Sequence, residues 1–564
     1  MFPRFGAFLQ NLFSKKLQKA LTKKQICGRI YDKCLLMLKK RKMYQKNEKT
    51  RKGKTMKLTR FICLLLACSF LVMPLWSCDG GMDDDVDGGG INADGSINWS
   101  EVDFKGATVK FSISASQDKE VTFGPADVYL QGPDSVSTDE VLKKVVARNA
   151  KIEKDLNIEV EYDTTDLTYD KVLEDIQLKV QGSATDAPDL YNNDMYGLNR
   201  AIIAGCLMNL ANPLDGKGNE QTSYFNFDDE GWNYEFMQGA TFDSNKVYIL
   251  AGDYYLDMIR MAWVLYVNKT MFNNNASALG AKDANEFYQY VLAGIWDYEM
   301  LTDMCSAIWK DTGKDRDKAD LEDERVGLAI NHIADWIFPA ATGLTPFYIN
   351  EDGKAESLSD IYEYNLMGTA FRDIYKSGGT GEGIYWQQEV LSSTEAFMNG
   401  NFLFAQSVLG ELESDELRNV SFEKGLVPFP KYDAGRQEEY HTMVHDQTEL
   451  GAVLVTTRSF ARASAFMQYA NELSEDVVTE YYEFSLKFKY NEDAAIRGMI
   501  DCVYESIDIP FGMQFELIIL NYGTGLTPLY EGIFYGSLSN KFDSNKQAYK
   551  VALDKALEEF NKLP

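Results

Sequence analysis

Residues 107–208 alternate between short β-rich segments and amphipathic helical segments. Residues 107–113 alternate apolar and polar side chains as a half-buried strand does, and residues 138–156 repeat Val, Leu and Ile at helical spacing. Two further strand–helix pairs follow, at 157–162 with 169–181 and at 187–191 with 198–208. Parallel strands need a crossover connection of this kind, usually a helix. The sequence therefore predicts an α/β lobe built on a parallel sheet.

A second constraint comes from residues 246–272, where two β-rich runs flank a polar and aromatic segment. The runs are residues 247–250 and 262–267. The segment between them holds Asp253, Tyr254, Tyr255, Asp257 and Arg260. Such a segment is atypical of a simple core strand, so we expect the chain to cross here from one lobe to another, along the wall of a cleft.

After this crossing the pattern becomes more helical and includes further strands. Helices are predicted at 283–292, 297–310, 361–376 and 394–399, and strands at 326–330, 402–406, 425–430 and 451–455. Residues 459–564 are predicted to be largely helical. The Gly-rich residues 377–383 lack a following Gly-Lys-Ser/Thr, which argues against a phosphate-binding loop.

Charge separates the N-terminal segment from the rest of the chain. Residues 1–77 hold 19 of the 57 Lys and Arg residues but only two of the 85 acids, Asp32 and Glu48. Residues 56–60 are basic and residues 61–76 are apolar, which is typical of a secretory signal peptide. We therefore expect residues 56–77 to be a signal peptide and residues 1–55 to be a basic extension that precedes the true start at Met56. The acidic remainder argues against a nucleic-acid partner, because it would repel phosphates.

The signal segment ends at Ser77 and Cys78, which is similar to a bacterial lipobox. This resemblance implies a lipid on Cys78 and a protein held on the outer face of a membrane. Residues 78–104 are rich in Gly and Asp and are predicted to be a flexible acidic tether. The tether contains an EF-hand-like spacing from Asp83 to Asp94, but no helices flank it and we expect no metal there.

Four segments occur in a fixed order along the chain. They are residues 188–190 with 204–210, residues 247–250 with 265–272, residues 396–406, and residues 426–431. In this order, and next to the lipobox, they resemble the maltose-binding-protein-like class of extracellular sugar-binding proteins, the solute receptors of ABC importers. The segment at 396–406 is similar to the helix and strand that lead back to the first lobe in that class.

This resemblance implies a two-lobed α/β fold of the periplasmic-binding-protein type, class II, with a ligand cleft between lobes joined by a hinge. Residues 105–255 and 408–458 would form the first lobe, and residues 256–407 and 459–564 the second. The implied function is a monomeric, lipid-anchored, extracytoplasmic receptor that hands a carbohydrate, an oligosaccharide, to ABC importer permease subunits. The resemblance implies no cofactor and no catalytic residue.

Sugars present apolar C–H faces and rings of hydroxyl groups, so a sugar site combines aromatic rings with fixed polar side chains. Residues of both kinds stand just beyond predicted strands or on the crossing segment. The candidate binding residues are Asn193, Asp194, Asp253, Tyr254, Tyr255, Arg260, Trp336, Tyr385, Trp386, Gln406 and Ser407. Helix capping is the alternative role for Asn193 and Asp194, and pairing with Asp257 is the alternative for Arg260.

Two other classes of function stay open. A glycoside hydrolase would need two carboxylates about 5 to 10 Å apart, and no local motif nominates a pair among so many acids. A surface glycan-binding lipoprotein that feeds an outer-membrane system is also compatible with an acidic tether.

His441 and His445 have a metal-ligand spacing, but their surroundings are not helical, so we expect no metal site. Cys206, Cys305 and Cys502 are scattered and are expected to be buried, with one disulfide among them left open.

Overall fold

The first sheet has the strand order β12-β3-β1-β2. β1 (Ala107–Ile113) pairs in parallel with β2 (Ile158–Thr164) and β3 (Leu190–Asp194), and β12 (Glu449–Val453) lies antiparallel to β3. α4 (Glu140–Leu156) and α5 (Val172–Gln181) connect the parallel strands, as the alternation in the sequence predicts. We call this sheet with its helices the first lobe.

The computed structural model describes residues 88–564, and twelve stretches within this range are left out. These are 114–125, 166, 168–170, 183–186, 311–324, 332–333, 359–360, 376–383, 388–390, 490–492, 509–531 and 533–535. The side chains of 334–336, 375, 384–387 and 391–392 also lie outside the description. The predicted extension 1–55, the signal peptide 56–77 and Cys78 are therefore outside the described residues. Within the described part of the chain, no helix is long and apolar enough to cross a membrane.

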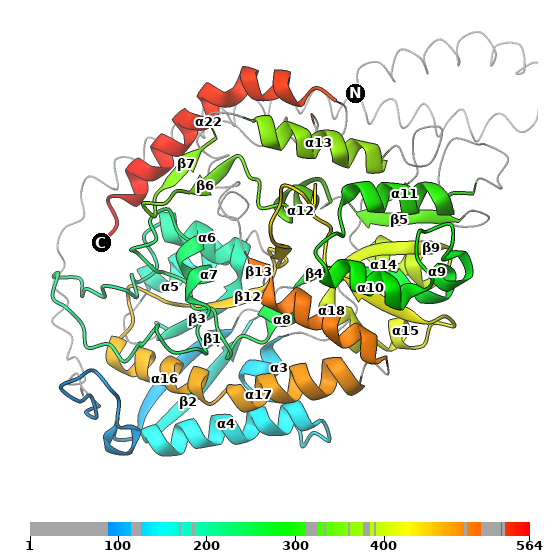
Figure 1. Cartoon of the computed structure of the whole chain (residues 1–564). Coiled ribbons are helices and arrows are strands. Elements are labelled where there is room, and N and C mark those ends of the chain that lie inside the picture. The colour runs from blue at the N-terminus through cyan, green and yellow to red at the C-terminus, as the bar shows by residue number, and fades with distance from the viewer. Residues whose placement is uncertain are drawn as a thin grey trace, which may run out of the picture. The chain divides into compact units, whose positions relative to one another are not determined.

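The second sheet has the order β10-β4-β9-β5-β8 and defines the second lobe. Its strands are β4 (Trp263–Asn268), β5 (Val326–Asn331), β8 (Ile384–Gln387), β9 (Phe402–Val408) and β10 (Lys424–Val427). β4, β5 and β9 are buried at every position, which accounts for their continuous apolar runs. Helices α11 (Tyr298–Ile308) and α14 (Leu391–Met398) pack on this sheet (Figure 1).

Within the described residues, three segments of the chain connect the lobes. Residues 251–262 lead to β4 and contain α8 (Asp257–Arg260), and residues 428–448 lead from β10 to β12 and contain β11 (Thr442–Met443). The third connection is a π-helix (Glu480–Lys489) between α17 (Glu475–Thr479) and α18 (Ala494–Glu505). Two α/β lobes joined by three crossings form a periplasmic-binding-protein-like fold, as predicted.

The remaining elements complete both lobes. In the first half of the chain they are α3 (Asp127–Leu130), α6 (Met195–Ile203), α7 (Tyr234–Gly239), α9 (Lys269–Asn275) and α10 (Ala284–Leu292). In the second half they are α12 (Ala334–Ala340), β6 (Phe347–Ile349), β7 (Ala355–Ser357), α13 (Tyr362–Tyr375), α15 (Asp415–Arg418), α16 (Phe460–Glu472), β13 (Ile507–Asp508) and α22 (Leu538–Phe560).

The lobe boundaries differ from those expected. β10 was expected in the first lobe but pairs antiparallel with β4 in the second sheet. β10 pairs with the edge of β4 that β9 leaves free. This pairing ends at Pro428, because proline has no amide hydrogen to donate. α16 was expected in the second lobe but packs on α4 of the first lobe.

Two local predictions are also wrong. Residues 247–250 form no regular strand, because only Leu250 makes a bridge, to Gly451. Residues 88–104 are not a free tether: Val102 and Phe104 are buried, and Trp99 stacks on Tyr469 at 4.5 Å between ring centroids. A short 3-10 helix (Trp99–Glu101) and these aromatic and apolar contacts fix this part of the chain on the first lobe.

Candidate functional site

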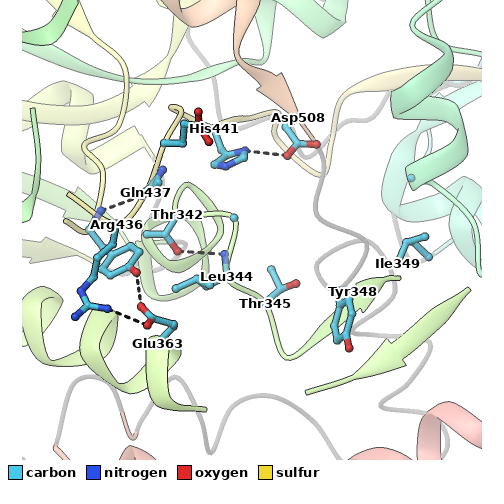
Figure 2. Close-up of a pocket in the computed structure, with 14 residues that line it drawn as sticks. Thr342, Leu344, Thr345, Tyr348, Ile349, Glu363, Arg436, Gln437, His441 and Asp508 are labelled. Atoms are coloured by element: carbon cyan, nitrogen blue, oxygen red, sulfur yellow. Dashed lines mark hydrogen bonds and ion pairs between the residues drawn. The ribbon is translucent and has the colours of Figure 1, made fainter. Parts of the chain in front are cut away.

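A cavity of about 770 Å³ opens where several loops of the two lobes meet (Figure 2). The first lobe contributes Gly239, at the end of α7. The second lobe contributes residues of the α12–β6 connection and of α13. The β10–β11 loop and β13 line the remaining sides. The other lining residues are Thr342, Gly343, Leu344, Thr345, Tyr348, Ile349, Glu363, Tyr432, Arg436, Gln437, Glu438, His441 and Asp508.

The α12–β6 turn is shaped by local hydrogen bonds. The hydroxyl of Thr342 donates to the carbonyl of Pro339, and the amide of Gly343 donates to the carbonyl of Ala340 at 2.8 Å. Gly343 has a φ of +72°, in the left-handed region, and a Cβ there would lie 2.8 Å from Nε2 of His441. Glycine thus satisfies the backbone of the turn and leaves space for the His441 imidazole.

An arginine–glutamate ion pair and a histidine–aspartate pair stand at separate sides of the cavity, with Thr342 between them (Figure 2). Nη1 of Arg436 lies 3.0 Å from Oε1 of Glu363, and the hydroxyl of Tyr432 donates to the same carboxylate at 2.5 Å. Burial, together with this hydrogen bond to Glu363, raises the pKa of Tyr432 above its ordinary value. At the other side, Nδ1 of His441 lies 3.0 Å from Oδ2 of Asp508. The cavity therefore offers donors, acceptors and tyrosine rings, which are the groups that bind polyhydroxylated molecules.

Gln437 holds the loop that carries these groups. Its side-chain amide donates to the carbonyls of Ala341 and Glu439 at 3.1 and 2.8 Å, and its carbonyl oxygen accepts from the Tyr432 amide at 3.0 Å. One side chain thus ties the β10–β11 loop to the α12–β6 turn and fixes both walls of the cavity.

Asn193 and Asp194 do not line this cavity. Both lie at the end of β3 and are 0% exposed. Oδ1 of Asp194 accepts from the amide of Gly197 at 2.6 Å and so caps α6, which is the alternative role considered for it. Their predicted place at an open cleft is wrong in this structure, because β12 and α6 cover the end of β3.

Tyr254 belongs to the core of the first lobe. It is 0% exposed, and the guanidinium of Arg148 lies 4.3 Å from its ring centroid. Phe111 and Phe466 pack near the same ring. A residue enclosed in this way is not accessible to a ligand, so the prediction that Tyr254 lines a binding cleft is wrong.

Arg260 forms a buried cluster of charges at the first crossing. It is 1% exposed, and its guanidinium lies 2.9 Å from Asp257 and 2.9 Å from Glu413. The hydroxyl of Tyr481 donates to Glu413 at 2.6 Å. Arg260 therefore pairs with Asp257, which is the alternative considered for it. The structure does not support a role for Arg260 in binding a ligand hydroxyl.

Gln406 and Ser407 are buried inside the second lobe near the end of β9. The Gln406 amide donates to Asn331 at 3.1 Å, and the Ser407 hydroxyl accepts from Thr394 at 2.8 Å. Trp336 lies in α12, and Tyr385 and Trp386 lie in β8, but their side chains are outside the described residues.

Asp253 and Tyr255 line a second cavity, of about 440 Å³, beside the first crossing. Tyr255 is only 2% exposed, and its hydroxyl donates to the sulfur of Met467 at 3.7 Å. These two are the predicted site residues that the described structure brings to a cavity.

Among the described residues, no group of three or more His, Cys, Asp or Glu side chains could hold a metal ion. His441 faces the first cavity, whereas His445 is buried and stacks on Trp263 at 5.0 Å between ring centroids. Cys206, Cys305 and Cys502 form no disulfide.

Many residues of the first cavity, those of 342–345 and 432–441, lie in connections that carry no helical or strand period, so periodicity did not mark them. Tyr348 and Ile349 lie in β6, Glu363 in α13 and Asp508 in β13. One usable signal was the long polar and aromatic loop after Pro428 and Pro430, because binding residues concentrate on loops held by rigid elements.

The two α/β lobes, their three crossings and the cavity at their meeting point define a periplasmic-binding-protein-like fold. No family model and no curated protein matches the chain. The chain is similar to the galacto-N-biose-/lacto-N-biose I-binding protein of the ABC transporter from Bifidobacterium longum, with 12% identity, a TM-score of 0.48, and 81% of this chain and 98% of that chain covered. It is also similar to the cyclic α-maltosyl-1,6-maltose binding protein from Arthrobacter globiformis, with 13% identity, a TM-score of 0.48, and coverage of 80% and 100%.

A third solved structure, a cyclo/maltodextrin-binding protein complexed with maltotetraose, has 13% identity, a TM-score of 0.46, and coverage of 81% of this chain and 98% of that chain. All three are sugar-binding proteins. The likeness is distant, and the two-lobed fold is established by the strand order and crossings of the chain itself.

Proposed function

We propose that this protein is a receptor that binds a carbohydrate in the cavity of Figure 2 and delivers it to an ABC importer. The observation that carries the proposal is that one cavity of about 770 Å³ is lined by the first lobe, the second lobe and a crossing loop together. A ligand held there touches parts of both lobes, so binding favours one arrangement of the lobes over others, as hinged receptors require.

The lining chemistry supports an oligosaccharide as the ligand class. Arg436 and Glu363 supply charge-assisted donors and acceptors for hydroxyl groups, and Tyr348 and Tyr432 supply rings for C–H faces. The cavity volume is within the range of small-molecule sites. A receptor needs no catalytic residue, and none is assigned here.

The proposal includes an anchor and partners. Cys78, at the end of the signal-like segment, would carry the lipid and hold a monomeric receptor on the outer face of a membrane. The permease subunits of the importer would then receive the sugar. The lipobox-like sequence at Ser77 and Cys78 supports this part of the proposal.

A thermal-shift screen of the full-length protein with maltose, cellobiose, xylobiose and their longer oligomers tests the proposal. We expect at least one sugar to raise the melting temperature by a few degrees at saturating concentration, and not to be cleaved. Arg436→Gln should weaken affinity for that sugar about tenfold or more, since hydrogen bonds to charged groups contribute more than neutral ones.

Arg418→Gln, which removes a partly exposed arginine of α15 that pairs with Asp415 and does not line the cavity, is the matched control and should leave sugar affinity unchanged. The assignment of this cavity would be overturned if no sugar raised the melting temperature, or if both variants lost the same amount of affinity for the sugar. Release of smaller sugars during the assay would instead identify a glycoside hydrolase.

A further inference from the structure

The cavity beside the first crossing differs in chemistry from the cavity of Figure 2. Its walls carry acidic and aromatic side chains, and no Lys, Arg or His is among the described residues that line it. The acids are Glu230, Glu235, Asp253 and Glu505, and the aromatic residues are Trp232, Tyr234, Tyr255 and Tyr504. The two cavities are neighbours, because Ile507 of β13 lines this one and Asp508 lines the other.

Backbone contacts place the Asp253 carboxylate at one wall. Gly252 forms an antiparallel bridge with Trp232, and the amide of Asp253 donates to the carbonyl of Gly231 at 2.9 Å. A Cβ on Gly252 would lie 2.5 Å from the Gly231 carbonyl oxygen and 2.9 Å from the Trp232 ring. The absence of a side chain at Gly252 therefore lets the crossing segment approach Trp232 closely and brings Asp253 next to it.

The Asp253 carboxylate is not compensated by the protein. Within the described residues, no donor hydrogen-bonds to it and no cation pairs with it. Burial, and next the nearby negative charge of Glu475 on α17, raise its pKa to about 7. The other titratable groups that line this cavity are Glu230, Glu235 and Glu505, with Tyr234, Tyr255 and Tyr504, and none of them carries a positive charge. A half-buried carboxylate in this setting gains free energy from a bound cation.

An unpartnered donor borders the same space. Asn471 on α16 is 1% exposed, and its Nδ2 has no hydrogen-bond partner among the described residues. A side chain on Gly231 would begin 2.8 Å from this Nδ2 and 3.4 Å from Oδ2 of Asp253. Because Gly231 lines the cavity and has no side chain, a free donor and a free carboxylate flank one point of its wall.

We propose that this cavity binds a small organic ammonium ion, with the Asp253 carboxylate as counter-ion and the rings of Trp232, Tyr234 and Tyr504 as its aromatic walls. Aromatic faces attract cations, and ammonium groups are bound in this way by rings next to acids. The inference does not depend on the sugar site, since no residue lines both cavities.

Isothermal titration calorimetry of the full-length protein tests the inference with matched pairs of probes. Choline represents a quaternary ammonium and 3,3-dimethyl-1-butanol is its neutral counterpart. Putrescine represents a primary ammonium and 1,4-butanediol is its neutral counterpart. We expect at least one of the two cations to bind at least tenfold more tightly than its neutral counterpart, and the pair that does so identifies the ammonium class.

Asp253→Asn should abolish this preference for the cation, whereas Asp415→Asn, the same chemical change on exposed α15, should preserve it. Both probes stay charged between pH 6 and 8, so the affinity of wild type for the cation should rise several-fold over this range as Asp253 ionises. Arg436→Gln should leave cation binding intact, which separates this site from the sugar site.

Failure of both cations to bind would overturn the inference. Equal binding of a cation and its neutral counterpart, or full retention of binding by Asp253→Asn, would do the same. Circular dichroism and the melting temperature of each variant verify that loss of binding is not loss of fold.

Discussion

The guanidinium of Arg260 forms two hydrogen bonds to the carboxylate of Glu413, at 2.9 and 3.3 Å. Arg260 belongs to the first crossing, and Glu413 ends a 3-10 helix (Leu409–Glu413) that follows β9 in the second lobe. Asp257 and the ring of Tyr129 contact the same guanidinium, so one side chain ties the crossing to both lobes.

Arg260→Met should destabilise the fold by about 3–5 kcal/mol, because it leaves the carboxylates of Asp257 and Glu413 buried without their cation. Urea denaturation followed by fluorescence measures the loss. Arg260→Met combined with Glu413→Gln should be more stable than Arg260→Met alone, since the second change removes one buried charge. A double variant no more stable than Arg260→Met would contradict this account.

Tyr254→Ala should lower the free energy of unfolding by roughly 3–5 kcal/mol, as large-to-small substitutions in a core do. The sequence had instead placed Tyr254 among the candidate binding residues, where its loss would lower ligand affinity. Tyr254→Phe is the control: it keeps the ring packed and removes the hydroxyl, which donates to the Leu130 carbonyl at 3.3 Å and is hydrogen-bonded with Tyr162, so its cost should be about 1–2 kcal/mol. Weak sugar binding with unchanged stability in Tyr254→Ala would restore the earlier interpretation.

Periodicity explains why the elements of the fold could be predicted. The helix predicted at 138–156 is α4, and the one at 283–292 is α10, because each presents one apolar face to a sheet or helix. The prediction of a strand at 247–250 is wrong for a physical reason. These residues are apolar because they are buried, and they do not pair along their length. Burial and strand pairing favour the same residues, so composition alone does not separate them.

The candidate site was harder to predict, because the polarity of a side chain does not reveal whether other groups of the protein already hydrogen-bond or pair with it. Asp194 caps its own helix, and Arg260 is neutralised by Glu413, 153 residues away in sequence. Asp253 has the same residue type as Asp194 but receives no donor in the described structure. Only the tertiary arrangement separates these cases.

Gly343→Ala should weaken sugar binding in the first cavity and lower stability by about 1–2 kcal/mol. The added methyl group would start 2.8 Å from Nε2 of His441 and displace this ring from Asp508. Gly280→Ala is the matched control, because Gly280 has a similar φ of +77° and no atom within 4 Å of its ideal Cβ. It should show the backbone cost of about 1 kcal/mol and unchanged sugar affinity, and similar affinities in both variants would contradict a role for His441.

Asp253→Asn should stabilise the protein at alkaline pH more than at acid pH. The pKa of Asp253 is about 7 in the folded state, against about 3.9 in an unfolded chain. Between these values the folded state keeps a proton that the unfolded state has released, so the contribution of Asp253 to stability falls as the pH rises. The stability gain of Asp253→Asn over wild type should therefore grow by roughly 3 kcal/mol between pH 4.5 and pH 8. Urea denaturation of both proteins at the two pH values measures this difference, and a gain that stays constant with pH would show that Asp253 ionises as it does in water.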